Sequence, residues 1–300
     1  MNHPKSLIRG SRIEIISPSG AMNDELIDKG AEQLGALGYH VTIAHHAKSN
    51  FGRFAGTAQQ RTEDFLQAFA NENVDAIWCS RGGYGCAHLL EALEKETDLQ
   101  LADKWLIGYS DITALHAYLN NRGMQSLHAP MLKHLAEEGN DTAITYTQKI
   151  LSGEYPRYTI DAHPLNKLGK TSATLRGGNL SVLLSLRGTP FDLPEDTDII
   201  LFIEDIAEQP YHIERMLYNL KLGGVFSRIK GLIVGQFSDC PEDTSMPGTI
   251  YESIASLMNE YNIPVCFNFP VGHVKDNYPL ICGAKTQLEV TDNGATVSFL

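Results

Sequence analysis

Three residue types that can together carry out nucleophilic catalysis follow predicted apolar strands, in the order serine, glutamate, histidine. Ser110 follows the run WLIGY, Glu204 ends the run IILFIE, and His273 lies just beyond VCFNF. A serine hydroxyl is a poor nucleophile at neutral pH, so it needs a base within hydrogen-bond reach, and the base needs a third group that fixes its tautomer. This pattern favours acyl transfer, with Ser110 as candidate nucleophile, His273 as candidate base and Glu204 as candidate orienting group.

Ser110 lies where a predicted strand turns into a predicted helix that ends near Gly123. A serine at a sharp strand-to-helix turn projects its hydroxyl above the sheet, as in a nucleophile elbow. The amide of Asp111 would then lie at a helix N-terminus and could stabilise an oxyanion. The same position also suits a helix N-cap, and GYSDI lacks the second glycine of G-x-S-x-G. The local sequence alone favours the cap.

A glycine-rich segment, RGGYG at 81–85, follows another predicted strand. Glycines let backbone amides approach a ligand closely, so this turn could supply a second oxyanion donor, for which Gly83 is our candidate. A dinucleotide site would instead need G-x-G-x-x-G after the first strand. Here the glycines follow the third strand and the last glycine is missing. A plain tight turn stays an equal alternative.

Neighbouring residues keep other assignments open. Asp205 is adjacent to Glu204 and could orient the base instead, and a carboxylate at a strand end can also simply face water. The chain has 11 histidines. His116 lies on a predicted helix, where we expect it to pack, whereas their sequence patterns do not exclude His128 and His212 as bases.

The first half of the chain alternates continuous apolar runs with stretches of helical periodicity. The runs begin near Arg12, Val41, Ala76 and Trp105. Continuous apolar strands that are each followed by a helix imply a parallel sheet buried on both faces, and right-handed crossovers then give a doubly wound sheet. Ligands bind beyond the carboxyl ends of such strands, which is where Ser110 lies.

A polar stretch with glycine and proline, 153–171, precedes a second series of elements. This series contains strands near Ile199, Gly231 and Val265, helices over 213–222 and 250–261, and a final hairpin around Asn293 and Gly294. We therefore expect an N-terminal α/β domain over 1–152 that carries the nucleophile elbow, a linker over 153–171, and a C-terminal α/β domain over 172–300 that carries the glutamate and the histidine.

Composition and charge argue against several classes of protein. A chain of 300 residues with 43% hydrophobic and 20% charged residues is typical of a globular protein of two ordinary domains. The formal net charge of -12, with no cluster of Lys and Arg, argues against nucleic-acid binding. No apolar run approaches the ~18 residues of a membrane span, and the N-terminus lacks the apolar run of a signal peptide.

The cysteines indicate a reducing compartment. There are five of them at scattered spacings, which argues against a disulfide framework and suits the cytosol. Neither C-x-x-C nor H-E-x-x-H occurs, so a zinc site has little support. We therefore expect a cytoplasmic protein without a metal centre.

Six short motifs in order make the chain resemble the LD-carboxypeptidase family of serine peptidases, which also contains the self-immunity peptidases against microcin C. The motifs are SPSG at 17–20, RGGYG at 81–85, GYSD at 108–111, GGNL at 177–180, FIED at 202–205, and Gly272-His273 with Asn277, Pro279 and Leu280 behind it. The resemblance runs from about residue 10 to the C-terminus.

The resemblance implies a triad of Ser110, His273 and Glu204, and an oxyanion hole of backbone amides, which we place at Gly83 and Asp111. It implies a flavodoxin-like N-terminal domain, a C-terminal domain with a mixed sheet, a homodimer, and no metal or organic cofactor. It also implies the reaction, removal of the terminal D-Ala from murein tetrapeptides during cytoplasmic recycling. Arg81 is our candidate for binding the substrate carboxylate, because its planar fork suits one, although it could equally hold the turn together.

Three other functions stay open. A microcin-type peptidyl-nucleotide peptidase is one, although the longer aromatic-bearing loop of that branch has no obvious counterpart here. A non-catalytic protein that binds murein peptides is the second, because fold does not determine function. An amidotransferase-like thiol enzyme that uses Cys79 or Cys86 is the third, although neither cysteine occupies the elbow.

Overall fold

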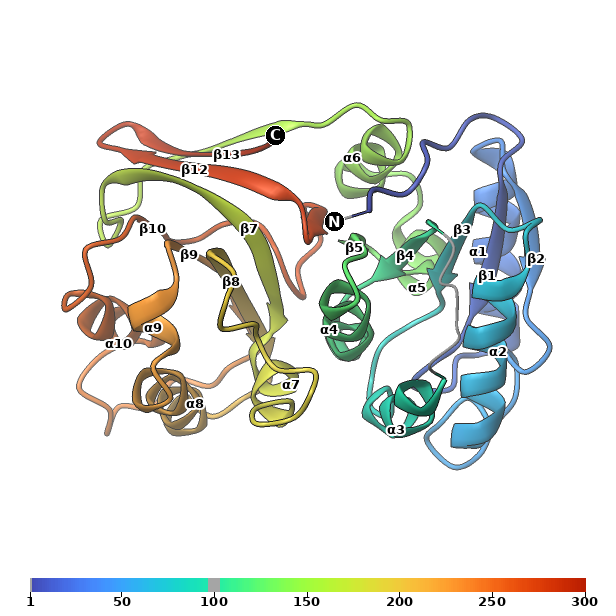
Figure 1. The fold of residues 1–300 in the computed structure, drawn as a ribbon, viewed down its shortest axis with the longest axis horizontal. Helices are drawn as coiled ribbons and strands as arrows, with labels where there is room; N and C mark the ends of the chain where they lie inside the picture. The colour runs from blue at the N-terminus through green and yellow to red at the C-terminus, as the bar shows by residue number, and fades with distance from the viewer. Residues whose placement is uncertain (1, 97–102) are drawn as a thin grey trace. The chain divides into compact units, whose positions relative to one another are not determined.

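The computed structural model describes residues 2–96 and 103–300. Contacts within the chain divide it into two units (Figure 1). The first contains the chain up to Glu154 together with Tyr278–Leu280, and the second contains Tyr155–Asn277 and Ile281–Leu300.

The first unit alternates strands and helices along the chain. Its elements are β1 (Arg12–Ile16), α1 (Asp24–Ala36), β2 (His40–Ile43), α2 (Ala58–Ala70), β3 (Ala76–Cys79), α3 (Ala87–Lys95), β4 (Trp105–Gly108), the 3-10 turn η1 (Ser110–Ile112), α4 (Thr113–Asn121), β5 (Ser126–His128), α5 (Leu132–Glu138) and α6 (Thr142–Leu151). The strands AIWC of β3 and WLIG of β4 are buried at every residue, which is why they read as continuous apolar runs.

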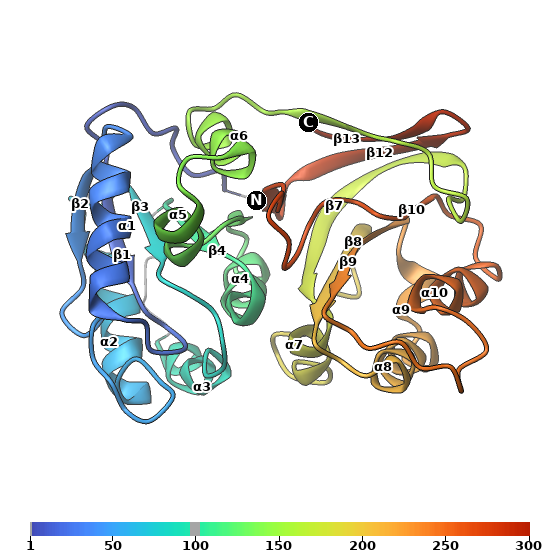
Figure 2. The ribbon, with the colours of Figure 1, turned by 180° about the vertical axis from the view of Figure 1, so that it is seen from behind.

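The strand order of the first sheet is β11-β5-β4-β3-β1-β2, where β11 (Leu280–Cys282) comes from the far end of the chain. The first five strands pair in parallel in the order 2-1-3-4-5, which is the flavodoxin-like order. Helices α2, α3 and α4 cover one face (Figure 1), and α1 packs with α5 on the other (Figure 2). The predicted doubly wound sheet is confirmed.

The second unit is built around a sheet of seven strands. Its elements are β6 (Arg157–Ile160), β7 (Gly169–Asn179), α7 (Leu180–Ser185), β8 (Ile199–Ile206), α8 (Pro210–Leu222), α9 (Val225–Arg228), β9 (Gly231–Ser238), α10 (Ile250–Met258), β10 (Val265–Cys266), β12 (Lys285–Thr291) and β13 (Gly294–Phe299). The stretch 153–171 therefore includes a strand, β6, which pairs with β13.

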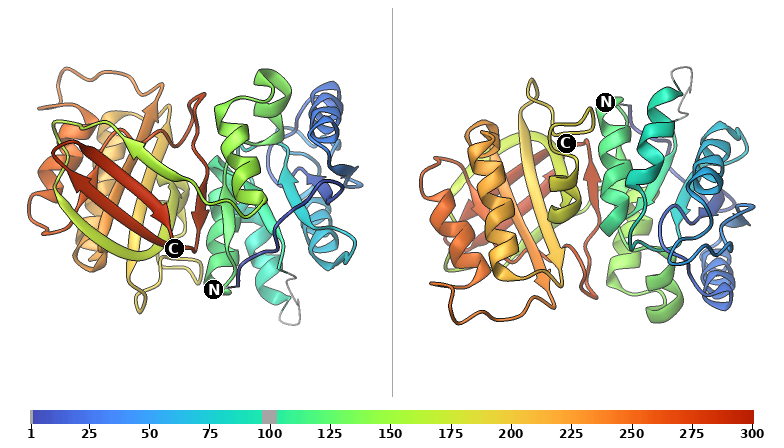
Figure 3. Two further views of the ribbon diagram at one scale, coloured as in Figure 1. Left: turned by 90° about the horizontal axis from the view of Figure 1, so that it is seen from above. Right: turned by 90° about the horizontal axis from the view of Figure 1, so that it is seen from below.

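This second sheet is mixed, as predicted. Its order is β10-β9-β8-β7-β12-β13-β6, with parallel pairing from β10 to β7 and antiparallel pairing from β7 to β6. The predicted terminal hairpin is the β12–β13 pair, drawn in red in Figure 3. Helices α8 and α10 pack together over a core of apolar side chains from β8, β9 and β10. Because β8, β9 and β10 pair in parallel, their carboxyl ends lie at the same edge of the sheet. Ligands bind at this edge in sheets of this kind.

Among the helices of residues 2–96 and 103–300, none is long and apolar enough to cross a membrane.

Candidate active site

Ser110 occupies a strained turn at the carboxyl end of β4. Tyr109 is extended, with φ -151 and ψ -170, and Ser110 then has φ 64 at the start of η1. A positive φ is unfavourable for a residue with a Cβ and is retained mainly where a function requires it. The N-cap positions of η1 and α4 are Tyr109 and Ile112, so Ser110 caps neither helix. The turn therefore has the form of a nucleophile elbow.

The glycine-rich turn after β3 lies against this serine. A Cβ built on Gly82 would lie 3.0 Å from Ser110 Oγ and 3.5 Å from the backbone nitrogen of Asp111. Gly82 therefore leaves open the space in front of the serine hydroxyl and the following amide. Gly83 has φ +126, a conformation that favours glycine. We singled out Gly83 from the sequence and missed Gly82, because only the fold shows which glycine faces the serine.

Arg81 bonds to backbone in the same region. Its Nε donates to Gly82 O at 3.2 Å and its Nη1 to Ala21 O at 3.2 Å, and its side chain is half-buried. The first bond lies within the turn after β3, and the second joins that turn to the turn after β1. They use two of the five N–H groups of a guanidinium, so a contact with a carboxylate is compatible with them.

His273 and Glu204 form a close pair in the second unit. His273 Nδ1 lies 2.8 Å from Glu204 Oε2, with the glutamate side chain fully buried and the histidine side chain 15% exposed. Because an ionised carboxylate only accepts hydrogen bonds, this contact places the ring proton on Nδ1 and leaves Nε2 as the basic nitrogen. The structure thus brings together two of the three residues selected from the sequence.

Local features of the backbone orient the side chains of Glu204 and His273. The pairing of β8 with β9 shifts register between Ile203 and Asp205, so Glu204 lies at an irregularity of the kind that redirects a side chain. Gly272 has φ +121, and a Cβ there would lie 2.8 Å from Glu204 Oε2. Its amide donates to Oδ1 of the buried Asn277 at 2.9 Å. Gly272 and Asn277 therefore hold the histidine loop close to the glutamate.

Asp205, the alternative orienting group, has different partners. Its carboxylate accepts hydrogen bonds from Asn179 Nδ2 at 2.8 Å, from the Ser181 amide at 2.8 Å and from the Ile206 amide at 2.9 Å. Burial raises its pKa to about 6 against the effect of these bonds. Asp205 therefore joins the end of β8 to the start of α7, and the adjacent Glu204 contacts the histidine.

His116, His212 and the two candidate cysteines have the surroundings of structural residues. His116 is buried, with Nε2 2.8 Å from Gly108 O and Nδ1 2.8 Å from Ser126 Oγ, and burial lowers its pKa to about 4. His212 lies 3.2 Å from Glu208 on the side of α8. Cys79 and Cys86 are fully buried, and burial raises the pKa of both thiols, which keeps them protonated.

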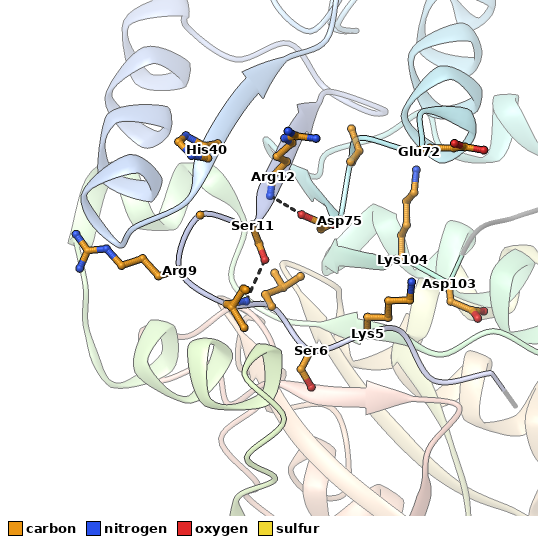
Figure 4. A pocket seen from close by; sticks show the side chains of 14 residues that line it. Lys5, Ser6, Arg9, Ser11, Arg12, His40, Glu72, Asp75, Asp103 and Lys104 are labelled. Carbon is orange, nitrogen blue, oxygen red and sulfur yellow. Dashed lines mark hydrogen bonds between the residues drawn. The ribbon is translucent and has the colours of Figure 1, made fainter.

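The first unit contains a cavity of about 700 Å³ (Figure 4). It is lined by residues at the amino-terminal ends of the strands, among them Arg12, the first residue of β1, and Lys104 before β4. Ser110 follows the carboxyl end of β4, so this cavity is at the opposite edge of the sheet. Its polar groups partly satisfy one another, as the bond from the Arg12 amide to Asp75 Oδ2 at 2.7 Å shows.

Known proteins resemble both units. The LD-carboxypeptidase N-terminal domain matches residues 13–129 and the LD-carboxypeptidase C-terminal domain matches residues 172–288. A putative carboxypeptidase of Synechocystis is 35% identical, over 99% of this chain and 97% of its own. A probable murein peptide carboxypeptidase of Bacillus subtilis is 31% identical, over 98% of this chain and 93% of its own.

A solved structure has the same fold. The crystal structure of muramoyltetrapeptide carboxypeptidase from Oxalobacter formigenes has a TM-score of 0.87 at 27% identity, and covers 96% of this chain and 98% of its own. Two domains matched in order, and a relative 35% identical along nearly the whole chain, show that this chain belongs to the LD-carboxypeptidase family of serine peptidases.

Proposed function

We propose that this protein hydrolyses the bond between an L-centre and the C-terminal D-Ala of murein tetrapeptides, through a triad of Ser110, His273 and Glu204. The observation that carries the proposal is the 2.8 Å contact between His273 Nδ1 and the buried Glu204, because it leaves Nε2 as a base. The positive φ of Ser110 at a strand-to-helix turn supports its role as nucleophile. The names of the relatives in Bacillus subtilis and Oxalobacter formigenes, a probable murein peptide carboxypeptidase and a muramoyltetrapeptide carboxypeptidase, support murein peptide as substrate.

The reaction proceeds through an acyl-enzyme. Ser110 Oγ attacks the carbonyl carbon of the L-centre while His273 Nε2 takes the hydroxyl proton. The tetrahedral intermediate collapses as the C–N bond breaks, and His273 gives its proton to the leaving amine of D-Ala. Water, deprotonated by His273, then attacks the ester carbonyl and releases the tripeptide and the free serine. Glu204 stabilises the imidazolium that forms in each half-reaction.

Backbone amides stabilise the developing charge. The amides of Asp111 and Gly83 donate to the oxyanion, and each such donor contributes roughly 3–4 kcal/mol by analogy with other oxyanion holes. The open space that Gly82 leaves beside Ser110 Oγ and the Asp111 nitrogen supports this position for the oxyanion. Arg81 binds the free carboxylate of the terminal D-Ala with the N–H groups that its backbone contacts do not use.

The location, oligomeric state and cofactor requirement of the enzyme are also part of the proposal. It acts in the cytoplasm during recycling of cell-wall peptides, as a homodimer, and without a metal or organic cofactor. The five cysteines are all free and four of them are buried, which suits a reducing compartment.

The test is mass spectrometry of L-Ala-D-Glu-diaminopimelate-D-Ala after incubation with the wild type and with Ser110→Ala. We expect the wild type to release D-Ala and the variant to be slower by on the order of 10⁶-fold, as for serine nucleophiles in other triads. The same peptide ending in L-Ala is the control for stereochemistry and should stay intact. Cleavage of a peptidyl nucleotide in place of the murein peptide would identify a microcin-type peptidase. Binding of the intact tetrapeptide without hydrolysis would identify a binding protein.

A further inference from the structure

We infer that Arg61 and Asp111 are positioning residues, whose side chains hold the glycine-rich turn 81–85 and the adjoining Cys86 beside Ser110, and so set where the oxyanion donors lie. This inference rests on the proposed function and adds two side chains that act through the backbone. Neither side chain was selected from the sequence for this role.

Asp111 connects three strand ends. Its own backbone follows β4, and its buried Oδ2 accepts a hydrogen bond from Ser19 Oγ at 2.5 Å and from the Cys86 amide at 2.9 Å. Ser19 lies in the turn after β1, and Cys86 adjoins the glycine-rich turn after β3. One carboxylate, on the residue that follows the nucleophile, therefore determines the spacing of both turns relative to the elbow.

Arg61 holds the same two turns from helix α2. Its Nη1 donates to Pro18 O at 2.7 Å and to Gly85 O at 2.9 Å. The residue is only 2% exposed, and its guanidinium lies 5.1 Å from the centre of the Phe54 ring. A Cβ on Gly85 would lie 2.8 Å from this Nη1, so a glycine is needed where the arginine reaches the turn. Arg61 and Asp111 therefore bind both turns in complementary ways, because Arg61 donates to their carbonyl groups and Asp111 accepts from their donors.

The cost of this arrangement argues for a role in positioning. Burying a guanidinium and a carboxylate is expensive, and an apolar pair of similar volume often gives equal stability. Burial lowers the pKa of Arg61, and the nearby Cys86 and Asp111 oppose that shift. The hydrogen bonds of these two side chains fix the positions of the backbone groups that they contact. This matters because a displacement of about 1 Å at a reacting centre can cost about 10²-fold in rate.

The chain offers a matched control in Lys104. This side chain is also a buried cation that donates to backbone carbonyls, with Nζ bonded to Ala68 O, Phe69 O and Asn71 O at 2.6–2.9 Å. Lys104, which Figure 4 labels, ties the end of α2 to the start of β4, and Ser110 follows the other end of that strand. Its removal should cost stability without affecting the elbow.

The experiment compares Arg61→Gln, Asp111→Asn and Ser19→Ala with Lys104→Met. For each we would measure the rate of Ser110 labelling by a fluorophosphonate, kcat and KM for D-Ala release, and unfolding in urea. We expect kcat and the labelling rate to fall about 10²-fold for Arg61→Gln and Asp111→Asn and about tenfold for Ser19→Ala, with KM within about threefold of wild type. Arg61→Lys, which keeps one donor, should recover part of the loss. Lys104→Met should unfold at lower urea and label at the wild-type rate.

Equal labelling by the wild type and by folded Arg61 and Asp111 variants would overturn the inference, as would an equal loss in Lys104→Met. If those two variants do not fold, Ser19→Ala decides, because it removes only one hydroxyl from the network, and labelling at the wild-type rate would then count against the role. A wild type that labels but leaves murein peptides intact would overturn the proposed substrate and leave this comparison in force. A wild type that does not label would overturn both proposals.

Discussion

At the scale of single residues, Gly82 is important to the proposed site because it has no side chain. Gly82 is not required by its own backbone conformation, since its φ is not in the region that favours glycine. It is required by its neighbour, because any Cβ there would meet Ser110 Cβ at 2.9 Å. The proposed site therefore needs a glycine at position 82, because any side chain there would fill the space beside Ser110.

This position gives a direct prediction. Gly82→Ala should lower kcat for D-Ala release by about 10²–10³-fold, because the methyl group occupies the space beside the serine hydroxyl and the oxyanion donor. Gly35→Ala is the matched control, since Gly35 is in α1 with nothing within 4 Å of its added Cβ. That control should keep its activity and gain about 0.5–1 kcal/mol in stability. Steady-state kinetics and urea unfolding of both variants test this, and an active Gly82→Ala enzyme would contradict the assignment.

The sequence points to single residues where a chemically reactive side chain coincides with a strand end. Ser110, Glu204 and His273 each follow a buried apolar run, and for Glu204 and His273 the fold then shows direct contact. Arg61 could not be found this way. An arginine in a helix is typical of a solvent-exposed face, and its role arises only from its contact with two turns that are distant along the chain.

At the scale of elements, helix α4 supports strand β4, which leads to Ser110. His116 on this helix lies within hydrogen-bond distance of the carbonyl of Gly108, the last residue of β4, and of the Ser126 hydroxyl on β5. Since a carbonyl only accepts, His116 carries its proton on Nε2 and accepts from Ser126 through Nδ1. The neutral ring is thus part of the framework beneath the elbow.

This framework should weaken in acid. The pKa of His116 is about 4 in the folded protein and about 6.5 when unfolded, so the unfolded chain takes up a proton first as the pH falls. Stability from this group is therefore present above pH 6.5 and lost toward pH 4, by about 2 kcal/mol between pH 7 and pH 5. The two tryptophans, Trp78 and Trp105, both lie in the first unit, so urea unfolding followed by their fluorescence reports it. A His116→Gln variant should lack this part of the pH dependence; an equal slope in both proteins would refute it.

Some elements were predictable from local pattern, and several of those that were not pair with distant segments. Strands β1 to β4 of the first unit follow from local apolar runs, whereas the short strand β5 was not predicted and β11 joins that sheet from residues 280–282. The long strand β7 was not predicted either, and it pairs with β12, more than a hundred residues away. Strand β6 lies in a stretch read as linker, because its partner β13 is more than a hundred residues away. Polar residues at an edge strand look like a loop until the partner strand is known.

At the scale of the whole molecule, the two units should respond to pH in opposite directions. Burial raises the pKa of Asp205 to about 6, so its folded form binds a proton before its unfolded form does. Its contribution to stability is present below about pH 4 and is lost as the pH rises through 6, which means that acid favours the second unit by about 1 kcal/mol between pH 7 and pH 5. Hydrogen exchange of β8 and β9 amides at both pH values, in the wild type and in Asp205→Asn, measures this. A wild-type unit that loses protection in acid as much as the variant would contradict it.

Membership of the family is established for the molecule as a whole, and the nucleophile is its central chemical claim. The most direct test is to quench the wild-type enzyme with acid during turnover of the murein tetrapeptide and to map any covalent adduct by mass spectrometry. We expect the mass of the tripeptide less one water on the tryptic fragment 105–122, at Ser110, and no turnover by Ser110→Ala. An adduct on Cys79 or Cys86, or wild-type turnover by Ser110→Ala, would contradict the account.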